Sequence, residues 1–202
     1  FTLALIAAIL VSLAWLIPVH YRPWVTYTGE LYAFFALLAL VTLFLKEKIK
    51  LPAVGLPLLL LSCVPLIQLV VDQVFFFSTA MMGSIYILSF WLASVLGYNF
   101  STGQFNREET FTNLSYVFLT SGTVTGLIAL CQWSNLDSVL PGMVNISGTT
   151  RPFANFAQPN NMATFLLMAL MSCLYLYEKK KIQTKWLIVC ALPIIIGIAL
   201  SQ

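Results

Sequence analysis

Charge is scarce in this sequence. Only 8% of its 202 residues are charged, whereas 60% are hydrophobic, and the mean hydropathy is +0.92. A soluble domain carries roughly 25% charged residues, so this chain has about a third of the charge that would cover a water-facing surface. The composition predicts a membrane protein and excludes a disordered chain. A nucleic-acid binder is also excluded, because the net charge of +3 comes without the exposed cluster of Lys and Arg that binds phosphates.

The sequence has only four cysteines, and no two of them form a CxxC motif. Each cysteine lies within or at the edge of an apolar run, where a thiol acts as a small hydrophobic group. The four are Cys63, Cys131, Cys173 and Cys190. We therefore expect neither a disulfide framework nor a cysteine metal site.

Long apolar runs fill most of the chain. A bilayer core about 30 Å thick requires about 20 apolar helical residues. Seven stretches meet or approach this length, namely residues 1–18, 27–45, 52–71, 78–97, 111–131, 160–177 and 186–200. The sequence thus predicts an all-α fold, a polytopic transmembrane helical bundle. Because the chain starts at Phe1 rather than Met and stops directly after an apolar run, we expect residues 1–202 to be the N-terminal part of a longer membrane domain.

The positive charges favour one side of the membrane. If the spans alternate in direction, eight of the ten Lys and Arg residues share one side, which the positive-inside rule makes cytoplasmic. Arg22 and Arg151 lie on the opposite, outward side, in the loops 19–26 and 132–159. The loops that hold the other eight are 46–51, 98–110 and 178–185.

Acidic residues are few on the outward side. Glu30, Asp72 and Asp137 are scattered there, and no DxD or similar carboxylate pair occurs. We therefore expect no bound metal and no cofactor. The apolar runs are almost free of charge, which weakens the hypothesis of an ion-coupled transporter, because such proteins carry intramembrane carboxylates.

Two features inside the spans predict packing rather than chemistry. The sequence from Gly122 to Gly126 is a GxxxG motif, which lets two helices approach closely. Pro65 and Pro193 fall inside predicted spans, where proline marks a kink.

The first outward loop contains His20, Arg22 and Trp24 between Pro18 and Pro23. Trp24 and its aromatic neighbours are typical of a belt at the lipid headgroups, with the histidine and arginine in contact with lipid phosphate. Alternatively, the two prolines stiffen a short loop so that His20 and Arg22 face a site on the outer side. Both interpretations stay open.

The second outward segment leads into the sixth span through polar residues. Pro159 suits the first helical turn, with Gln158 or a neighbour at the cap. The free N–H groups at this outward helix start favour an anion, and Arg151 offers a bidentate guanidinium for phosphate. Neutral amides suit sugar hydroxyls, and the part of this segment from Arg151 to Ala163 has four: Asn155, Gln158, Asn160 and Asn161. The pattern predicts a site for phosphate and sugar, although the same residues also make ordinary loops and caps.

The run from Arg151 to Ala163, RPFANFAQPNNMA, resembles a signature of the bacterial O-antigen ligase superfamily in its protein O-oligosaccharyltransferase branch. The residues that resemble the opening outer loop of that branch are Trp15, Pro18, His20, Pro23, Trp24 and Glu30.

The resemblance implies a multi-pass enzyme of the bacterial inner membrane with its active face in the periplasm. Such an enzyme moves an oligosaccharide from undecaprenyl diphosphate to Ser or Thr of a periplasmic protein such as a pilin. Its arginines hold the lipid-linked diphosphate, so Arg151 and Gln158, and then Asn160, are the positions carried over. The essential histidine of the family lies in a later loop, so we expect it beyond residue 202 and expect residues 1–202 to be inactive alone. His20 does not lie in the corresponding region.

Three other hypotheses remain from the sequence, of which a structural membrane subunit is favoured only if no lipid-linked glycan binds. A ligase or glycan polymerase of the same superfamily uses the same donor with lipid A or a growing glycan as acceptor. A lipid or polysaccharide transporter without chemistry would use Arg151 for binding or gating and would move glycan with its diphosphate linkage intact.

Overall fold

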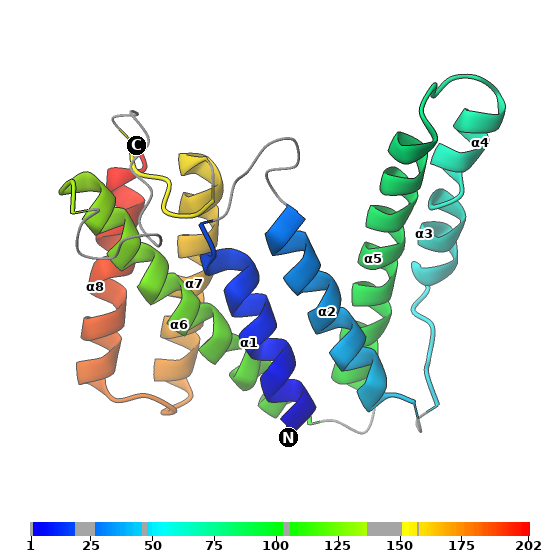
Figure 1. The fold of residues 1–202 in the computed structure, drawn as a ribbon. Helices are drawn as coiled ribbons and strands as arrows, with labels where there is room; N and C mark the ends of the chain where they lie inside the picture. Colours follow the sequence, from blue (N-terminus) through cyan, green and yellow to red (C-terminus); the bar gives the residue numbers. More distant parts are fainter. Residues whose placement is uncertain (1, 19–26, 46–47, 103–105, 137–150, 157) are drawn as a thin grey trace. The chain divides into compact units, whose positions relative to one another are not determined.

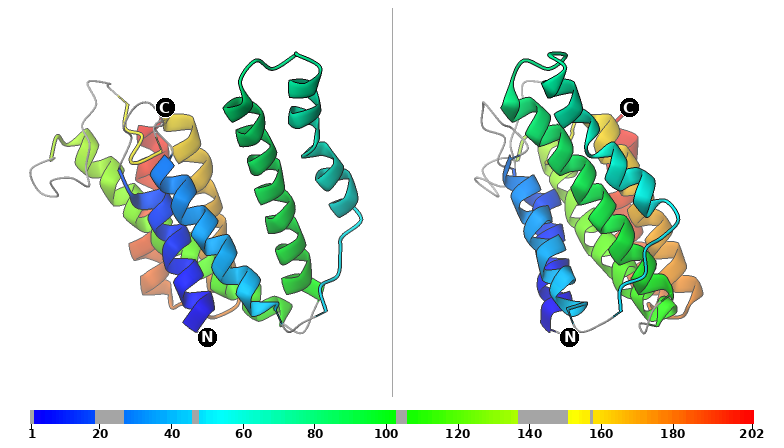
Figure 2. Two further views of the ribbon diagram at one scale, coloured as in Figure 1. Left: turned by 45° about the vertical axis from the view of Figure 1, so that its right-hand side comes forward. Right: turned by 90° about the vertical axis from the view of Figure 1, so that its right-hand side faces the viewer.

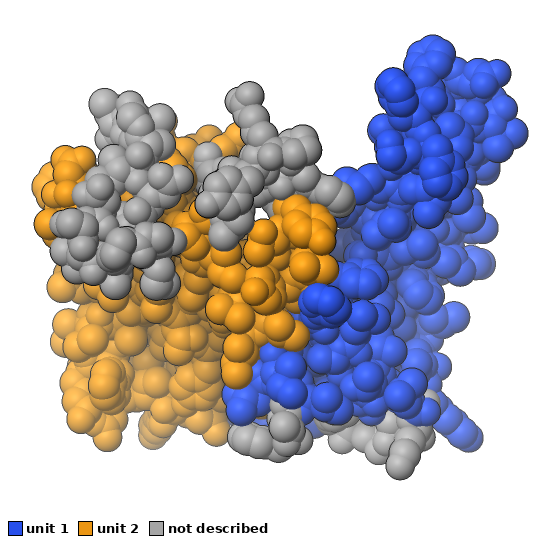
Figure 3. Space-filling view, viewed as in Figure 1, with its two compact units in different colours: residues 1–7, 34–110 blue, residues 8–33, 111–202 orange. Residues whose placement is uncertain are grey.

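The computed structural model describes residues 2–18, 27–45, 48–102, 106–136, 151–156 and 158–202. These residues form helices and connecting segments with no strand among them, which confirms the predicted all-α class (Figure 1; Figure 2 gives two further views). The chain divides into two compact units, coloured separately in Figure 3. Unit 1 comprises residues 1–7 and 34–110, and unit 2 comprises residues 8–33 and 111–202.

Each of the seven expected spans contains helical structure. Within the described residues the helices are α1 (Thr2–Leu16), α2 (Tyr27–Leu43), α3 (Gly55–Leu61), α4 (Val64–Val70), α5 (Phe77–Thr102), α6 (Arg107–Trp133), α7 (Pro159–Glu178) and α8 (Thr184–Leu200). By length and composition, α5, α6 and α7 are long and apolar enough to cross a membrane. The other apolar helical segments are shorter, with 10–17 residues each, where α3 and α4 are taken together as Gly55–Val70. The protein is therefore a helical membrane protein, and the number and bounds of its crossings stay a prediction.

In unit 1 the expected span at 52–71 is broken into α3 and α4. The break falls at Ser62 and Cys63, and Pro65 occupies the first turn of α4. Proline is favourable there, because the N–H group that it lacks would have no partner within the helix. Both short helices pack along α5 (Figures 1 and 2). A Cβ added at Gly83 of α5 would lie 3.3 Å from Cγ of Pro65, so the kink predicted from this proline lies against a glycine.

A buried asparagine fixes the chain that enters α3. The Nδ2 group of Asn99 in α5 donates to the Lys50 carbonyl at 2.8 Å, and the Lys50 N–H donates to Oδ1 at 2.9 Å. Asn99 is buried. Its two bonds satisfy both backbone groups of one residue, as a neighbouring strand would do.

In unit 2, glycines bring α6 into backbone contact with α7 and α8. A Cβ added at Gly122 would clash with Cβ of Ala169 in α7, and one added at Gly126 would lie 2.5 Å from the Pro193 carbonyl oxygen in α8. A Cβ added at Gly197 of α8 would lie 3.3 Å from Cα of Gly126. The helix packing predicted from the GxxxG motif is confirmed, and its partners are the α7 and α8 helices.

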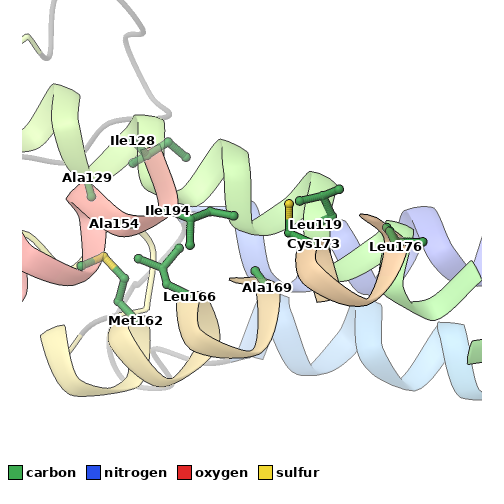
Figure 4. Close-up of a cluster of buried hydrophobic side chains, with 10 residues drawn as sticks. All are labelled: Leu119, Ile128, Ala129, Ala154, Met162, Leu166, Ala169, Cys173, Leu176 and Ile194. Atoms are coloured by element: carbon green, nitrogen blue, oxygen red, sulfur yellow. The ribbon is translucent and has the colours of Figure 1, made fainter. Parts of the chain in front are cut away.

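The core of unit 2 lies between the same helices and is mostly apolar (Figure 4). Along α7 the small residues Ala169 and Cys173 lie between the larger Leu166 and Leu176, which leaves room for close packing at the middle of the helix. The fully buried thiol of Cys173 belongs to this cluster, as expected for a cysteine that acts as a small hydrophobic group. The cluster residues are Leu119, Ile128, Ala129, Ala154, Met162, Leu166, Ala169, Cys173, Leu176 and Ile194.

The two ends of unit 2 differ in character. The turn between α7 and α8 carries Lys179, Lys180 and Lys181, and the Tyr116 hydroxyl of α6 donates to the Lys181 carbonyl at 3.1 Å. Because α7 and α8 pack against each other through this short turn, the start of α7 and the end of α8 lie together at the opposite end. The polar segment from Arg151 lies at that second end.

We expect the Gly126→Ala substitution to destabilise the protein. The added methyl group would meet the Pro193 carbonyl, and overpacking of this kind costs about 1–3 kcal/mol. Gly97→Ala is the matched control, because a Cβ at this position of α5 would meet nothing within 4 Å. The effect of each substitution is measured as the unfolding temperature of the detergent-solubilised full-length protein. A Gly126→Ala variant that unfolds at the same temperature as Gly97→Ala would contradict this packing.

Candidate functional site

The segment Arg151–Phe156 is held in place by one buried side chain of α6. The carboxamide oxygen of Gln132 accepts the N–H groups of Phe153, at 3.1 Å, and Ala154, at 2.7 Å. Its Nε2 group donates to the Ala154 carbonyl at 2.8 Å. Gln132 is 8% exposed. One side chain thus satisfies three buried backbone groups of a segment with no regular structure of its own.

Ala154 adopts a backbone conformation that suits glycine better than alanine. Its φ is 48°, and its side chain is 1% exposed within the core cluster. The left-handed region costs an L-residue about 1–2 kcal/mol. Hydrogen bonds contribute about 0.5–1.5 kcal/mol each, so the three bonds to Gln132 are large enough to offset this strain.

Asn155 connects the same segment to the end of α1. Its Nδ2 group donates to the Leu16 carbonyl at 2.5 Å, and the residue is 6% exposed. Leu16 ends α1, so its carbonyl is one of the acceptors that an α-helix leaves without an internal partner. The structure therefore gives this amide donor a partner in the protein, at the C-terminal end of α1.

Arg151 connects the segment to the end of α8. Its Nε group donates to the Ser201 carbonyl at 3.0 Å, and its Nη2 group donates to the same oxygen. Ser201 is buried and caps α8, whereas Arg151 is exposed. A cation at the C-terminal end of a helix is favourable, because the helix dipole is negative there. The guanidinium is thus anchored at the C-terminal end of α8, and Arg151 is open to solvent.

The start of α7 agrees with the sequence prediction. Gln158 is the N-cap residue with extended backbone angles, φ −143° and ψ 134°, and Pro159 lies in the first turn. The Gln158 side chain makes no capping hydrogen bond. The side chains of Gln158, Asn160 and Asn161 are all exposed. The first turn therefore presents neutral amides at the protein surface, and the Gln158 side chain leaves its backbone N–H groups uncapped.

The two motifs quoted from the sequence meet in space. Trp15 of the first motif has its ring centroid 4.8 Å from that of Phe165 in α7 and 5.1 Å from that of Phe118 in α6. Phe165 also contacts Phe156, with centroids 4.7 Å apart. Together with the bond from Asn155 to Leu16, this aromatic cluster fixes the end of α1 beside the Arg151–Phe156 segment.

Some predicted positions cannot be placed in this arrangement. His20, Arg22 and Trp24 lie outside the described residues. The structure brings Arg151, Asn155 and the start of α7 into one segment, but it directs the Asn155 donor inward. The sequence interpretation missed Gln132 and Ser201. The only signal for Gln132 was an amide at the end of an apolar helix, and Ser201 contributes a backbone carbonyl, which any residue would supply.

Comparison with known proteins points to one family. The protein glycosylation ligase family matches residues 152–177, which include the segment after Arg151 and most of α7. The chain is 46% identical over all of its 202 residues to a general O-oligosaccharyltransferase of Acinetobacter baylyi, of which it covers 35%. It is 27% identical over 156 residues to a ComP-specific O-oligosaccharyltransferase of the same organism, with 76% of this chain and 28% of that protein covered. The chain thus spans about a third of the length of these relatives. No solved structure matches it.

The Asn155→Asp substitution tests the contact with α1. The carboxylate cannot donate to the Leu16 carbonyl and would place an oxygen against it in a buried position, which costs about 1–3 kcal/mol or more. Asn160→Asp is the control, because Asn160 is exposed in the first turn of α7, where a negative charge is favourable. We expect the unfolding temperature of the full-length protein to fall for Asn155→Asp only. An equal effect of both substitutions would show that this contact does not hold α1.

Proposed function

Because this chain belongs to the protein O-oligosaccharyltransferase branch of the O-antigen ligase superfamily, we propose that its protein transfers an oligosaccharide from a lipid-linked diphosphate to a protein. The donor lipid is undecaprenyl diphosphate, and the acceptor is a Ser or Thr hydroxyl of a periplasmic protein such as a pilin. The enzyme is a multi-pass protein of the bacterial inner membrane, and its active face is periplasmic. The lysine-rich turn between α7 and α8 is cytoplasmic in this proposal, in line with the positive-inside rule.

One observation carries the proposal. Arg151 is anchored by the Ser201 carbonyl at the end of unit 2 where α7 begins, and it directly precedes the part of the chain that the protein glycosylation ligase family matches. The first turn of α7 has no side-chain cap, so its N–H groups and the positive end of its dipole are available to an anion. A guanidinium and a helix start at one end of a membrane protein suit the diphosphate of a lipid whose tail lies in the bilayer.

The chemistry is a substitution at the anomeric carbon of the first sugar. The acceptor hydroxyl oxygen attacks this carbon, the bond from the carbon to the diphosphate oxygen breaks, and the hydroxyl proton passes to a general base. Negative charge grows on the departing diphosphate, where Arg151 and the N–H groups at the start of α7 stabilise it. The resemblance assigns the essential histidine, a candidate for this base, to a later outer loop.

The exposed amides at the start of α7 suit the glycan. Gln158, Asn160 and Asn161 each carry a donor and an acceptor, which is what sugar hydroxyls need. Asn155 takes a supporting role in the proposal, because its donor holds the end of α1. His20, Arg22 and Trp24 remain candidates on the first outward loop.

A protein acceptor distinguishes this proposal from its rivals. The matching family is described as a protein glycosylation ligase, and both curated relatives carry the name of an O-oligosaccharyltransferase. Acceptor labelling with a radioactive lipid-linked glycan separates the outcomes. Label on a protein supports the proposal, whereas label on lipid A or on a lengthened glycan supports a ligase or polymerase.

We expect Arg151→Gln to reduce glycan transfer by about 100-fold or more, as loss of one donor to a developing negative charge does. Glutamine keeps a polar side chain near Ser201 and removes the positive charge. Arg107→Gln is the matched control. It removes an exposed arginine at the first residue of α6, which lies at the opposite end from Gln132 along a helix of 27 residues. Transfer is measured with full-length protein in membranes, with folding checked by size-exclusion chromatography. Full activity of a folded Arg151→Gln variant would contradict the assignment.

A further inference from the structure

Gln132 is the buried polar side chain on which the backbone of the Arg151–Phe156 segment depends. It lies in the last turn of α6, 8% exposed, and makes three hydrogen bonds to residues 153 and 154. These bonds connect positions that are 21 and 22 residues apart in sequence. Nothing in the sequence pattern assigned this residue to the site.

The bonds fix a turn that the local sequence does not favour. Ala154 has φ 48°, and alanine gives no preference for this left-handed conformation. The Gln132 oxygen accepts the N–H groups of Phe153 and of the turn residue Ala154, and its Nε2 group donates to the Ala154 carbonyl. The carboxamide acts here as a backbone edge would in a sheet.

The direction of Arg151 follows from this turn. Only Pro152 separates Arg151 from Phe153, and the proline ring fixes its own φ. On the other side of the turn, Asn155 reaches Leu16 and the chain continues to the cap of α7. A displaced turn would therefore move the guanidinium relative to the first turn of α7.

The helices themselves do not need Gln132 to pack. The α6 helix contacts α7 and α8 at Gly122 and Gly126, and the core cluster extends along α7 as far as Leu176. Loss of the three hydrogen bonds would therefore release the backbone at Phe153 and Ala154 and leave the helix packing in place.

We propose that Gln132 is a positioning residue for the lipid-linked donor, which acts through Phe153 and Ala154 to keep Arg151 at the end of unit 2 where α7 begins. This inference rests on the proposed function and deepens it, because it separates the residue that binds the diphosphate from the residue that places it.

The test compares kinetics of full-length Gln132→Met and wild-type enzyme with undecaprenyl-diphosphate-linked oligosaccharide and an acceptor protein. Methionine fills the same space without the three hydrogen bonds. We expect the KM for the donor to rise at least tenfold, while the KM for the acceptor protein stays within twofold. Gln183→Met is the matched control, since Gln183 is exposed at the start of α8, at the lysine-rich end.

A merely structural role gives a different result. It would lower the amount of active enzyme, and so the apparent kcat, at an unchanged donor KM, and this outcome would overturn the inference. Hydrogen exchange supplies a second readout that does not depend on activity. Faster exchange of the Phe153 and Ala154 amides in Gln132→Met, with unchanged exchange in the middle of α7, supports the inference, and unchanged exchange at these two amides overturns it.

Two further variants keep the test decisive. The Gln132→Met/Ala154→Gly double variant removes the cost of the left-handed turn. We therefore expect its donor KM to be at least threefold lower than that of Gln132→Met. If Gln132→Met does not fold, Gln132→Glu keeps an acceptor for both N–H groups, loses the donor to Ala154 and places a carboxylate oxygen against the Ala154 carbonyl. We expect its donor KM to rise about threefold, and an unchanged value overturns the inference.

The wild-type measurement separates the two levels of the account. If the wild-type protein transfers glycan from this donor and Gln132→Met has an unchanged donor KM, only the role of Gln132 is overturned. If the wild-type protein transfers nothing from any lipid-linked diphosphate, the proposed function fails, and the inference fails with it.

Discussion

The close approach of α6 to α7 and α8 is the constraint on which unit 2 depends. At Gly122 and Gly126 the surface of α6 is bare backbone, and Ala169 and Pro193 fill the space that side chains would take. In a membrane, helices gain little from burying apolar surface, so contact between backbones and van der Waals packing carry the association. This contact sets the distance between the α6 and α7 ends, and so the space available to the segment that joins them.

That segment is positioned by hydrogen bonds between side chains and backbone. Gln132 holds Phe153 and Ala154, Asn155 holds Leu16, and Arg151 holds Ser201. Each bond satisfies a backbone group that regular structure leaves without a partner, at a helix end or in an irregular turn. The result places a guanidinium and a helix start at the same end of three packed helices, a preorganised arrangement suited to an anionic group.

The sequence predicted the parts of this structure that depend on local pattern. Apolar runs predicted the helices, and the GxxxG motif predicted that α6 packs closely against other helices. Pro159 after Gln158 predicted where α7 starts. The three connections of the Arg151–Phe156 segment had no such signal. Their acceptors include the carbonyls of Leu16 and Ser201, and every residue has a carbonyl. The distances along the chain are 139 residues from Asn155 to Leu16 and 50 from Arg151 to Ser201. Ala154 has the conformation expected of glycine, so its turn could not be predicted from the residue type either.

The central claim is that the lipid-linked diphosphate lies between Arg151 and the first turn of α7. A cryo-electron microscopy structure of the full-length protein with undecaprenyl-diphosphate-linked oligosaccharide tests this most directly. The account predicts diphosphate oxygens within hydrogen-bond distance of the Arg151 guanidinium and of the backbone N–H groups of Asn160 or Asn161. A diphosphate bound at another place, with Arg151 directed only at the Ser201 carbonyl, would contradict it.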